Sequence, residues 1–253
     1  MNKSWNNTSL MTYIEIMDNI NSEEDNTFLL LSIIFDISIL DIEEMNIDKV
    51  QEMIKESLYI HSPVVTSKTY KKKITLRNEG FHLMEFGKME FGAFIDLEIL
   101  FYGDYLKNLP KILSILYRRE ITPGDVFNKP LYEEYGDWLD IRDSIFEEVM
   151  IGDVFNVIID YLKFKSSIYS IYEGLFQQNE EELNEEEETE LLREMTGKER
   201  EEYYNEKNVE GYGWELMLMR LANNDPTKML EASKMTLYQS LNTLGMMCKL
   251  KIG

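Results

Sequence analysis

Histidine and cysteine, the side chains that most often bind transition metals, are rare in this sequence and lie far apart. The two histidines are His61 and His82, and the single cysteine is Cys248. None of them belongs to a His-x-x-His, Cys-x-x-Cys or Glu-x-x-His arrangement, and a zinc or di-metal site needs several ligands converging with fixed geometry. We therefore expect no metal site and no cofactor, and we interpret His82 as a surface or half-buried residue.

Nucleophilic catalysis requires a serine or cysteine beside a base that a third group orients. The sequence contains no Gly-x-Ser-x-Gly elbow and no glycine-rich phosphate loop before a helix. Cys248 follows Leu237, Leu241 and Leu244 at the spacing of a helix-packing seam, so we expect it to act as a small apolar side chain. These observations favour a protein that is not an enzyme.

One segment has the composition of a carbohydrate-cleaving cleft, where paired carboxylates lie among aromatic rings. Its aromatic and acidic residues are Tyr132, Glu133, Glu134, Tyr135, Asp137 and Trp138. An amphipathic helix with an aromatic face explains the same residues more simply, and we predict such a helix over 132–147. A carboxylate-based enzyme stays an alternative.

Two charged clusters and one tryptophan are the candidates for contact with a partner. The basic cluster suits an acidic surface or a phosphate, and the acidic run suits a basic partner or mimics the phosphates of DNA. A solvated surface is the simpler explanation of each cluster. Trp214, at the start of a predicted helix, is a natural anchor for that helix. The candidate partner-binding residues are Lys71, Lys72, Lys73, Arg77, Trp214, Glu185, Glu186, Glu187 and Glu188.

The charge balance limits the classes of partner. The chain has 253 residues, with 26 basic against 47 acidic side chains and a formal net charge of −21. Such a charge repels nucleic acid and anionic membranes, so we expect no direct nucleic-acid or membrane binding and favour a partner with a basic surface. Met1–Leu10 lacks the apolar core of a secretory signal, and Phe28–Leu40 is too short and interrupted to span a bilayer. A cytoplasmic protein is therefore expected.

Apolar periodicity predicts a mainly α fold with one small β-hairpin. The run Phe28–Leu40 is apolar on nearly all sides and is expected at the centre of the N-terminal core. Alternation around a turn at Asn78–Gly80 predicts a hairpin near 70–84, the only convincing β element. Further helices are expected from Asp48, from Phe91, around 112–116 and over 153–176.

The composition divides the chain into three parts. Residues 1–176 are predicted to form a mainly helical domain, and 177–210 an acidic linker or exposed helix. Residues 211–253 are predicted to form a C-terminal helical hairpin, with helices over 214–222 and 227–250. Asp225 is the expected cap of the second helix, with Pro226 at its first position.

The sequence shows a family resemblance in Met11–Met17, Ile47–Val50, Met89–Glu98, Asn108–Arg118, Gly213–Trp214 and Leu221–Asp225. Together these stretches are similar to proteins of tailed bacteriophages, including the crAss-like phages, that are encoded among the particle genes. Some members of this group are tail-assembly chaperones, and others are virion components near the portal and tail or proteins packaged in the head. The resemblance is structural in character and brings no catalytic residues.

This resemblance implies a phage morphogenesis protein that acts through contacts with other phage structural or assembly proteins. It also implies a homo-oligomer or multi-copy assembly, located in the virion or the host cytoplasm. The large negative charge leaves a second hypothesis open, an acidic binding inhibitor of a host protein that imitates DNA.

Overall fold

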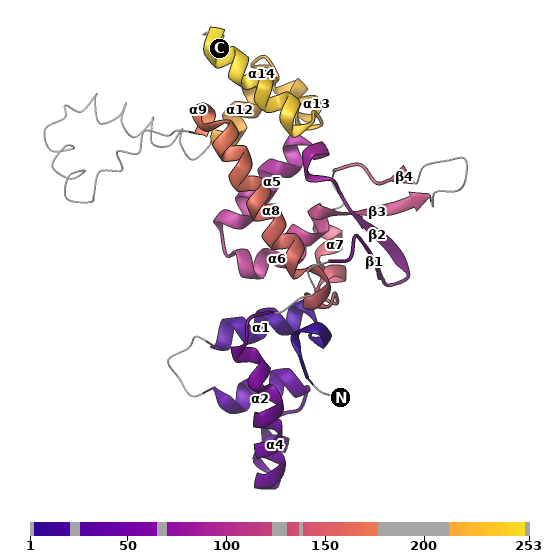
Figure 1. Cartoon of the computed structure of the whole chain (residues 1–253). Coiled ribbons are helices and arrows are strands. Elements are labelled where there is room, and N and C mark those ends of the chain that lie inside the picture. The colour runs from indigo at the N-terminus through magenta and orange to yellow at the C-terminus, as the bar shows by residue number, and fades with distance from the viewer. Residues whose placement is uncertain are drawn as a thin grey trace, which may run out of the picture. The chain divides into compact units, whose positions relative to one another are not determined.

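The structure, a computed structural model, describes residues 3–20, 26–64, 70–122, 131–136, 139–176 and 213–250 (Figure 1). The fold is mainly α-helical with one small antiparallel sheet, which confirms the predicted fold class. The chain forms two compact units. The first contains Met1–Phe86 and Asp96–Phe164, and the second contains Gly87–Ile95 and Lys165–Gly253. The predicted acidic linker at 177–210 lies outside the described residues.

The N-terminal part of the first unit is a group of short helices. Ser38 and Asn46 act as N-caps because their side chains accept hydrogen bonds from the backbone N–H groups of Asp41 and Asp48. The buried Trp5 ring packs edge-on against other aromatic rings in this group. The helices are η1 (Trp5–Asn7), α1 (Leu10–Ile20), α2 (Thr27–Phe35), α3 (Ile39–Glu43), α4 (Ile47–Ser57) and η2 (Leu58–His61).

The apolar run 28–40 is two helices and not one central helix, so that prediction was wrong. Asp36 adopts a left-handed conformation with φ of 55° and ends α2. Within α2 only Leu31 and Ile34 are buried, whereas Phe28 is 41% exposed and Leu40, in α3, is 71% exposed. The apolar side chains of this run therefore lie partly in the core and partly on the surface.

Among the described residues the sheet has four antiparallel strands, in the order β1 (Lys73–Leu76), β2 (Glu79–Leu83), β3 (Tyr117–Thr122) and β4 (Leu131–Tyr132). The predicted hairpin is confirmed as β1 and β2, but its turn residues are Arg77 and Asn78, with φ of 47° and 67°. A two-residue turn with positive φ at both positions matches the twist of the strands.

Two further strands join this hairpin, so the prediction of a single β element was wrong. The sequence patterns predict a helix around 112–116 and another over 132–147. In the structure α6 (Tyr105–Leu116) ends where β3 begins, and α7 starts only at Leu139 and ends at Phe146. In an isolated hairpin, the outer edge of β2 would leave its backbone N–H and C=O groups unpaired. Pairing with β3 satisfies these groups.

Aromatic packing fills the core of the first unit. Phe81 of β2 meets Phe146 of α7 at a ring-centroid distance of 5.2 Å. Tyr117 of β3 is fully buried, and its hydroxyl donates to the carbonyl of Lys71 at 2.7 Å. Tyr161 of α8 (Ile151–Ile171) is also fully buried. The predicted helix over 153–176 is interrupted at Tyr172 and resumes as α9 (Glu173–Phe176).

The second unit contains the C-terminal helices α12 (Gly213–Leu221), η4 (Pro226–Lys228), α13 (Met229–Ser233) and α14 (Leu237–Leu250). Asp225 caps η4 as predicted, accepting from the N–H of Thr227 at 3.0 Å. The single helix predicted over 227–250 is broken near Thr236, which forms a β-bridge with Glu90 just before α5 (Phe91–Tyr102). Leu237, Leu241 and Leu244 are buried as the seam spacing predicts, but Cys248 is exposed.

Candidate functional site

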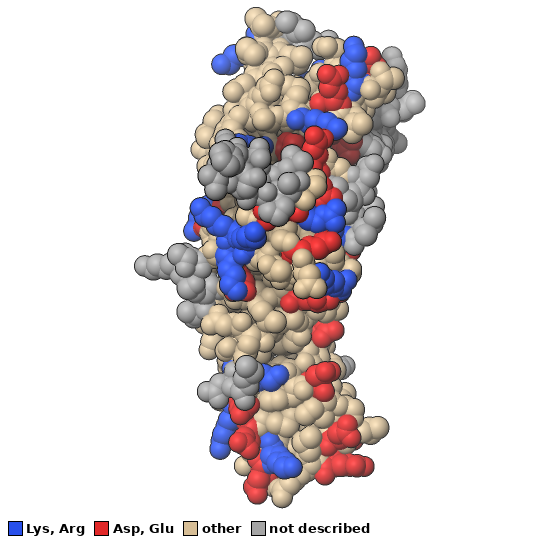
Figure 2. All heavy atoms as spheres, turned by 90° about the vertical axis from the view of Figure 1, so that its right-hand side faces the viewer, with Lys and Arg blue, Asp and Glu red and all other residues tan. Residues whose placement is uncertain are grey.

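The predicted basic cluster lies at β1, and acidic side chains of the same chain neutralise much of it. Lys71 pairs with Asp153 at 2.7 Å, and Arg77 pairs with Glu148 at 2.5 Å. Figure 2 shows that acidic and basic side chains are mixed over the face that it draws. Exposed pairs of this kind contribute about 0–1 kcal/mol each to stability. The cluster is therefore a balanced surface more than a strong positive patch.

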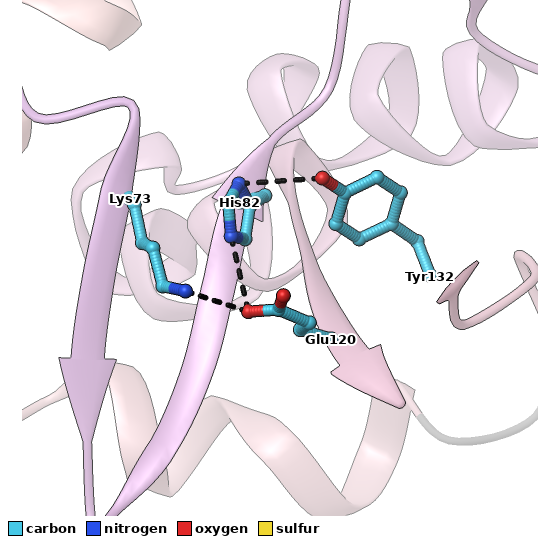
Figure 3. A network of polar contacts seen from close by, with 4 residues as sticks. All are labelled: Lys73, His82, Glu120 and Tyr132. Carbon is cyan, nitrogen blue, oxygen red and sulfur yellow. Dashed lines mark hydrogen bonds and ion pairs between the residues drawn. The ribbon is translucent and has the colours of Figure 1, made fainter. Parts of the chain in front are cut away.

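Lys73, the next residue of this cluster, belongs to a polar network that crosses all four strands (Figure 3). Its Nζ lies 2.7 Å from Oε2 of Glu120, and Nε2 of His82 lies 3.2 Å from the same oxygen. The Tyr132 hydroxyl lies 3.5 Å from Nδ1 of His82, at the outer limit of a hydrogen bond. The ammonium group of Lys73 donates a hydrogen bond to the Glu120 carboxylate, and this bond is the main reason that the pKa of Glu120 lies below its usual value.

This network joins the strands on one face of the sheet. Residues that pair in antiparallel register point to the same face, and the pairs Lys73–His82 and Glu120–Tyr132 are in register. Gly80 leaves room for the carboxylate, because a Cβ there would lie 3.2 Å from Oε2 of Glu120. An imidazole between a carboxylate and a phenol can relay a proton. Here the same contacts serve as cross-strand ties.

The segment that the sequence offers as a carboxylate catalytic cleft, around Glu133, forms ion pairs beside the sheet. Glu133 contacts the guanidinium of Arg142, and its Oε2 lies 3.5 Å from Nε of Arg119. Arg142 is buried over the ring of Phe81, and burial, with the charges of Arg119 and Arg118, lowers its pKa to about 10. A general acid needs an apolar environment that keeps it protonated. Glu133, held between guanidinium groups, suits a structural ion pair instead.

Trp214 lies in an aromatic cluster inside the second unit. Its ring centroid is 6.2 Å from that of Phe91, 5.5 Å from that of Phe94 and 5.6 Å from that of Phe176. These rings come from the start of α5, from α9 and from α12, so Trp214 ties three segments together. The contacts suit the anchoring role that the sequence suggests for Trp214, and a role in binding a partner stays a prediction.

Glu185, Glu186, Glu187 and Glu188 lie outside the described residues, as do Asp137 and Trp138. Lys72 is exposed beside β1, and its role in partner binding also stays a prediction. The structure therefore brings Lys71, Lys72, Lys73 and Arg77 together and leaves the proposed contact with a partner as a hypothesis.

The second unit has an open groove of about 720 Å³ between α14 and the segment around α9. Tyr172 and Asn242 meet at this groove, with the tyrosine hydroxyl 3.0 Å from Oδ1 of the asparagine. Its lining residues are Ile171, Tyr172, Gly174, Leu175, Leu241, Asn242, Gly245, Met246, Cys248 and Lys249. The exposed thiol of Cys248 thus lies at a groove and not in a helix seam, which corrects the interpretation of this residue.

Helix α4 carries a stripe of exposed apolar side chains that the sequence analysis missed. Ile47 is 69% exposed, Ile54 is 38% exposed and Leu58, just after the helix, is 57% exposed. Residues seven and four apart lie on one face of a helix, so these three side chains form a line along α4. The helix buries only Ser57. We call this line, Ile47 with Ile54 and Leu58, the α4 stripe.

The α4 stripe lies at the edge of a small packed layer. α4 contacts α2, and the inward-turned side of α4 includes Ser57 and the half-covered Val50 and Met53. In Figure 1, α4 extends beyond the ends of α1 and α2. Exposed apolar side chains that lie together on one face make a candidate surface for contacts with other proteins. The amphipathic period of this segment was visible in the sequence, but periodicity does not show which part of an apolar face is covered.

The comparisons with known proteins add no family to these observations. No protein-family model, curated protein or solved structure matches this chain. Within the described ranges no helix is long and apolar enough to cross a membrane. The same ranges contain no group of three or more His, Cys, Asp or Glu side chains placed to hold a metal ion.

Proposed function

We propose that this protein is a phage morphogenesis protein that works by holding other proteins. It is either a component of the virion, near the portal and tail or packaged in the head, or a tail-assembly factor. The phage assignment comes from the resemblance of Met11–Met17 and the other stretches given above. Action through protein contacts is supported chiefly by the α4 stripe, whose isoleucines are 69% and 38% exposed.

This observation carries the proposal because the three exposed apolar side chains lie together on one helix face, whereas single exposed apolar residues are ordinary on a protein surface. Burial of one isoleucine or leucine side chain stabilises a complex by about 1.5–3 kcal/mol, so a free apolar line favours association. Helices in grooves are a recurring form of protein recognition, read by anchors at helical spacing. The spacing of the α4 stripe matches such anchors.

The test is quantitative mass spectrometry of gradient-purified phage particles and of infected-cell lysate from the source system. A stable, stoichiometric copy number in particles supports a virion component. Abundance in lysate together with absence from particles, and recovery in complexes with particle proteins, supports an assembly factor. Absence from particles and recovery only with host proteins would overturn the phage-assembly proposal.

The last of these outcomes is the one expected for an acidic inhibitor that imitates DNA. The net charge of −21 favours that candidate. Its diagnostic measurement is competition with DNA for a host nuclease or repressor recovered with the protein. A phage-assembly protein is instead expected to be recovered with particle proteins.

A further inference from the structure

The surroundings of the α4 stripe narrow the chemistry of what it binds, on the assumption that the protein does act by holding other proteins. Between residues 36 and 56, seven acidic and two basic side chains are exposed, a local balance of −5. The basic ones are Lys49 and Lys55, and the acidic ones are Asp36, Asp41, Glu43, Glu44, Asp48, Glu52 and Glu56. The segment that carries the α4 stripe is therefore acidic as a whole.

A second copy of the same chain is a poor match for this surface. Two copies docked through the stripe would bring two acidic regions together within about one Debye length, 8–10 Å at physiological salt. Each whole chain also carries a net charge of −21. Like-charge contacts oppose association, whereas a basic partner is attracted over the same distance.

The spacing of the three side chains in the α4 stripe suits the binding of a helix. Ile47 and Ile54 are almost two helical turns apart, and Leu58 follows one turn later. A partner helix with apolar residues at heptad-like spacing would place its anchors along this line, with its charged residues at both sides. We propose that the α4 stripe binds an amphipathic helix of a partner protein, and that the polar side of this helix is rich in lysine and arginine.

The experiment uses the full chain and two designed peptides. One is a 14-residue amphipathic peptide of leucine and lysine, and the other replaces each lysine with glutamate. Binding is measured by fluorescence anisotropy of labelled peptide at low and at near-physiological salt. The wild-type protein is expected to bind the lysine peptide, more tightly at low salt, and not the glutamate peptide.

The decisive variant is Ile47→Gln with Ile54→Gln, which removes apolar area without changing charge. Glutamine is a good helix former, so α4 is expected to persist. The exposed parts of the two side chains, 69% and 38%, add up to about one isoleucine. The lysine peptide should therefore bind roughly 30-fold more weakly, which corresponds to about 2 kcal/mol at 1.4 kcal/mol per tenfold change.

The matched control is Ile99→Gln with Ile159→Gln. These isoleucines lie on helices of the same unit and are 51% and 37% exposed. The control is expected to bind the lysine peptide as the wild type does. Circular dichroism of both double variants establishes that each keeps its helix content, so a weaker Kd reports the surface and not unfolding.

Three results would overturn the proposal. The first is equal affinity of the wild type and the α4 variant for the lysine peptide. Tight binding of the glutamate peptide is the second, because it removes the role of charge. The third is concentration-dependent dimerisation by sedimentation that the α4 variant abolishes, which would make a second copy the occupant. Co-purification of particle proteins with the α4 variant would still leave the proposed function standing, so the two failures are distinguishable.

Discussion

Replacement of Trp214 by alanine separates a structural role from a binding role at this residue. Trp214 contacts the rings of Phe91, Phe94 and Phe176 at centroid distances between 5.5 and 6.2 Å. Truncation of a buried aromatic side chain costs about 3–5 kcal/mol of unfolding free energy. Trp214 is half-buried, so we expect the low end of this range, about 3 kcal/mol, of which each lost ring contact contributes about 0.5–1.5 kcal/mol.

Urea denaturation followed by circular dichroism measures the loss, and hydrogen exchange shows where it acts. Faster exchange is expected in α12 and at the start of α5, because these segments lose their shared anchor. Trp214→Phe retains part of the packing and is expected to cost about 1 kcal/mol. An unfolding free energy of Trp214→Ala within about 0.5 kcal/mol of the wild type would refute the reasoning. If partner binding is lost at the same time, Trp214 is a surface contact.

Three further predictions concern single contacts. Tyr117→Phe removes the 2.7 Å hydrogen bond to the carbonyl of Lys71 and should lower the unfolding free energy by about 1 kcal/mol, measured by urea denaturation. The Glu120 carboxyl has a lowered pKa because Lys73 donates to it, so its contribution to stability is complete above the ordinary pKa of 4.5 and is lost as the pH falls through the folded-state pKa. Glu120→Gln should lack this loss when stability is measured across that range. Asn46 caps α4 by accepting a 3.0 Å hydrogen bond from the N–H of Asp48. Asn46→Ala removes this cap and should lower the unfolding free energy by about 0.5–2 kcal/mol and increase hydrogen exchange in α4.

Each of these predictions has an outcome that contradicts it. An unchanged stability of Tyr117→Phe would mean that water or another donor satisfies the Lys71 carbonyl. An identical pH profile for wild type and Glu120→Gln would show that the polar network of Figure 3 does not favour the charged carboxylate. Asn46→Asp keeps the cap, so equal effects of aspartate and alanine at this position would exclude capping as the cause.

The fold class could be predicted from the sequence because apolar periodicity is local. The hairpin of β1 and β2 depends on alternation over a few residues and on a turn with Asn78, and both are visible without a structure. The start of α4 after Asn46 and the cap at Asp225 depend on neighbouring residues alone. Features with local causes were therefore within reach.

The errors in the predicted elements have long-range causes. The break before α14 arises where the N–H of Leu237 donates to the carbonyl of Met89 at 2.8 Å, a contact between residues far apart in the sequence. Tyr117 and Arg118 are compatible with a helix end by propensity, and pairing with β2 makes them a strand. Single-sequence patterns contain no information on such pairings.

The candidate site shows the same difference between what a sequence pattern predicts and which contacts the fold forms. The basic residues at β1 were visible as a cluster, but their ion pairs with Asp153, Glu120 and Glu148 join segments distant in sequence. The sequence also predicts a helix from Asp48, but periodicity does not show whether the apolar face of that helix is covered. Only the structure shows that Ile47 is 69% exposed and Ile54 38% exposed.

The negative charge and the α4 stripe act at different stages of binding. Charge acts over about 10 Å and raises the rate of encounter with a basic partner, but it contributes little once salt screens it. The apolar line acts only in contact and lengthens the lifetime of the complex. Neutralising Glu52 and Glu56 should therefore slow association, whereas Ile47→Gln with Ile54→Gln should speed dissociation. Stopped-flow measurement with the lysine peptide separates the two rates, and a purely association-rate effect of the isoleucine changes would refute this division of roles.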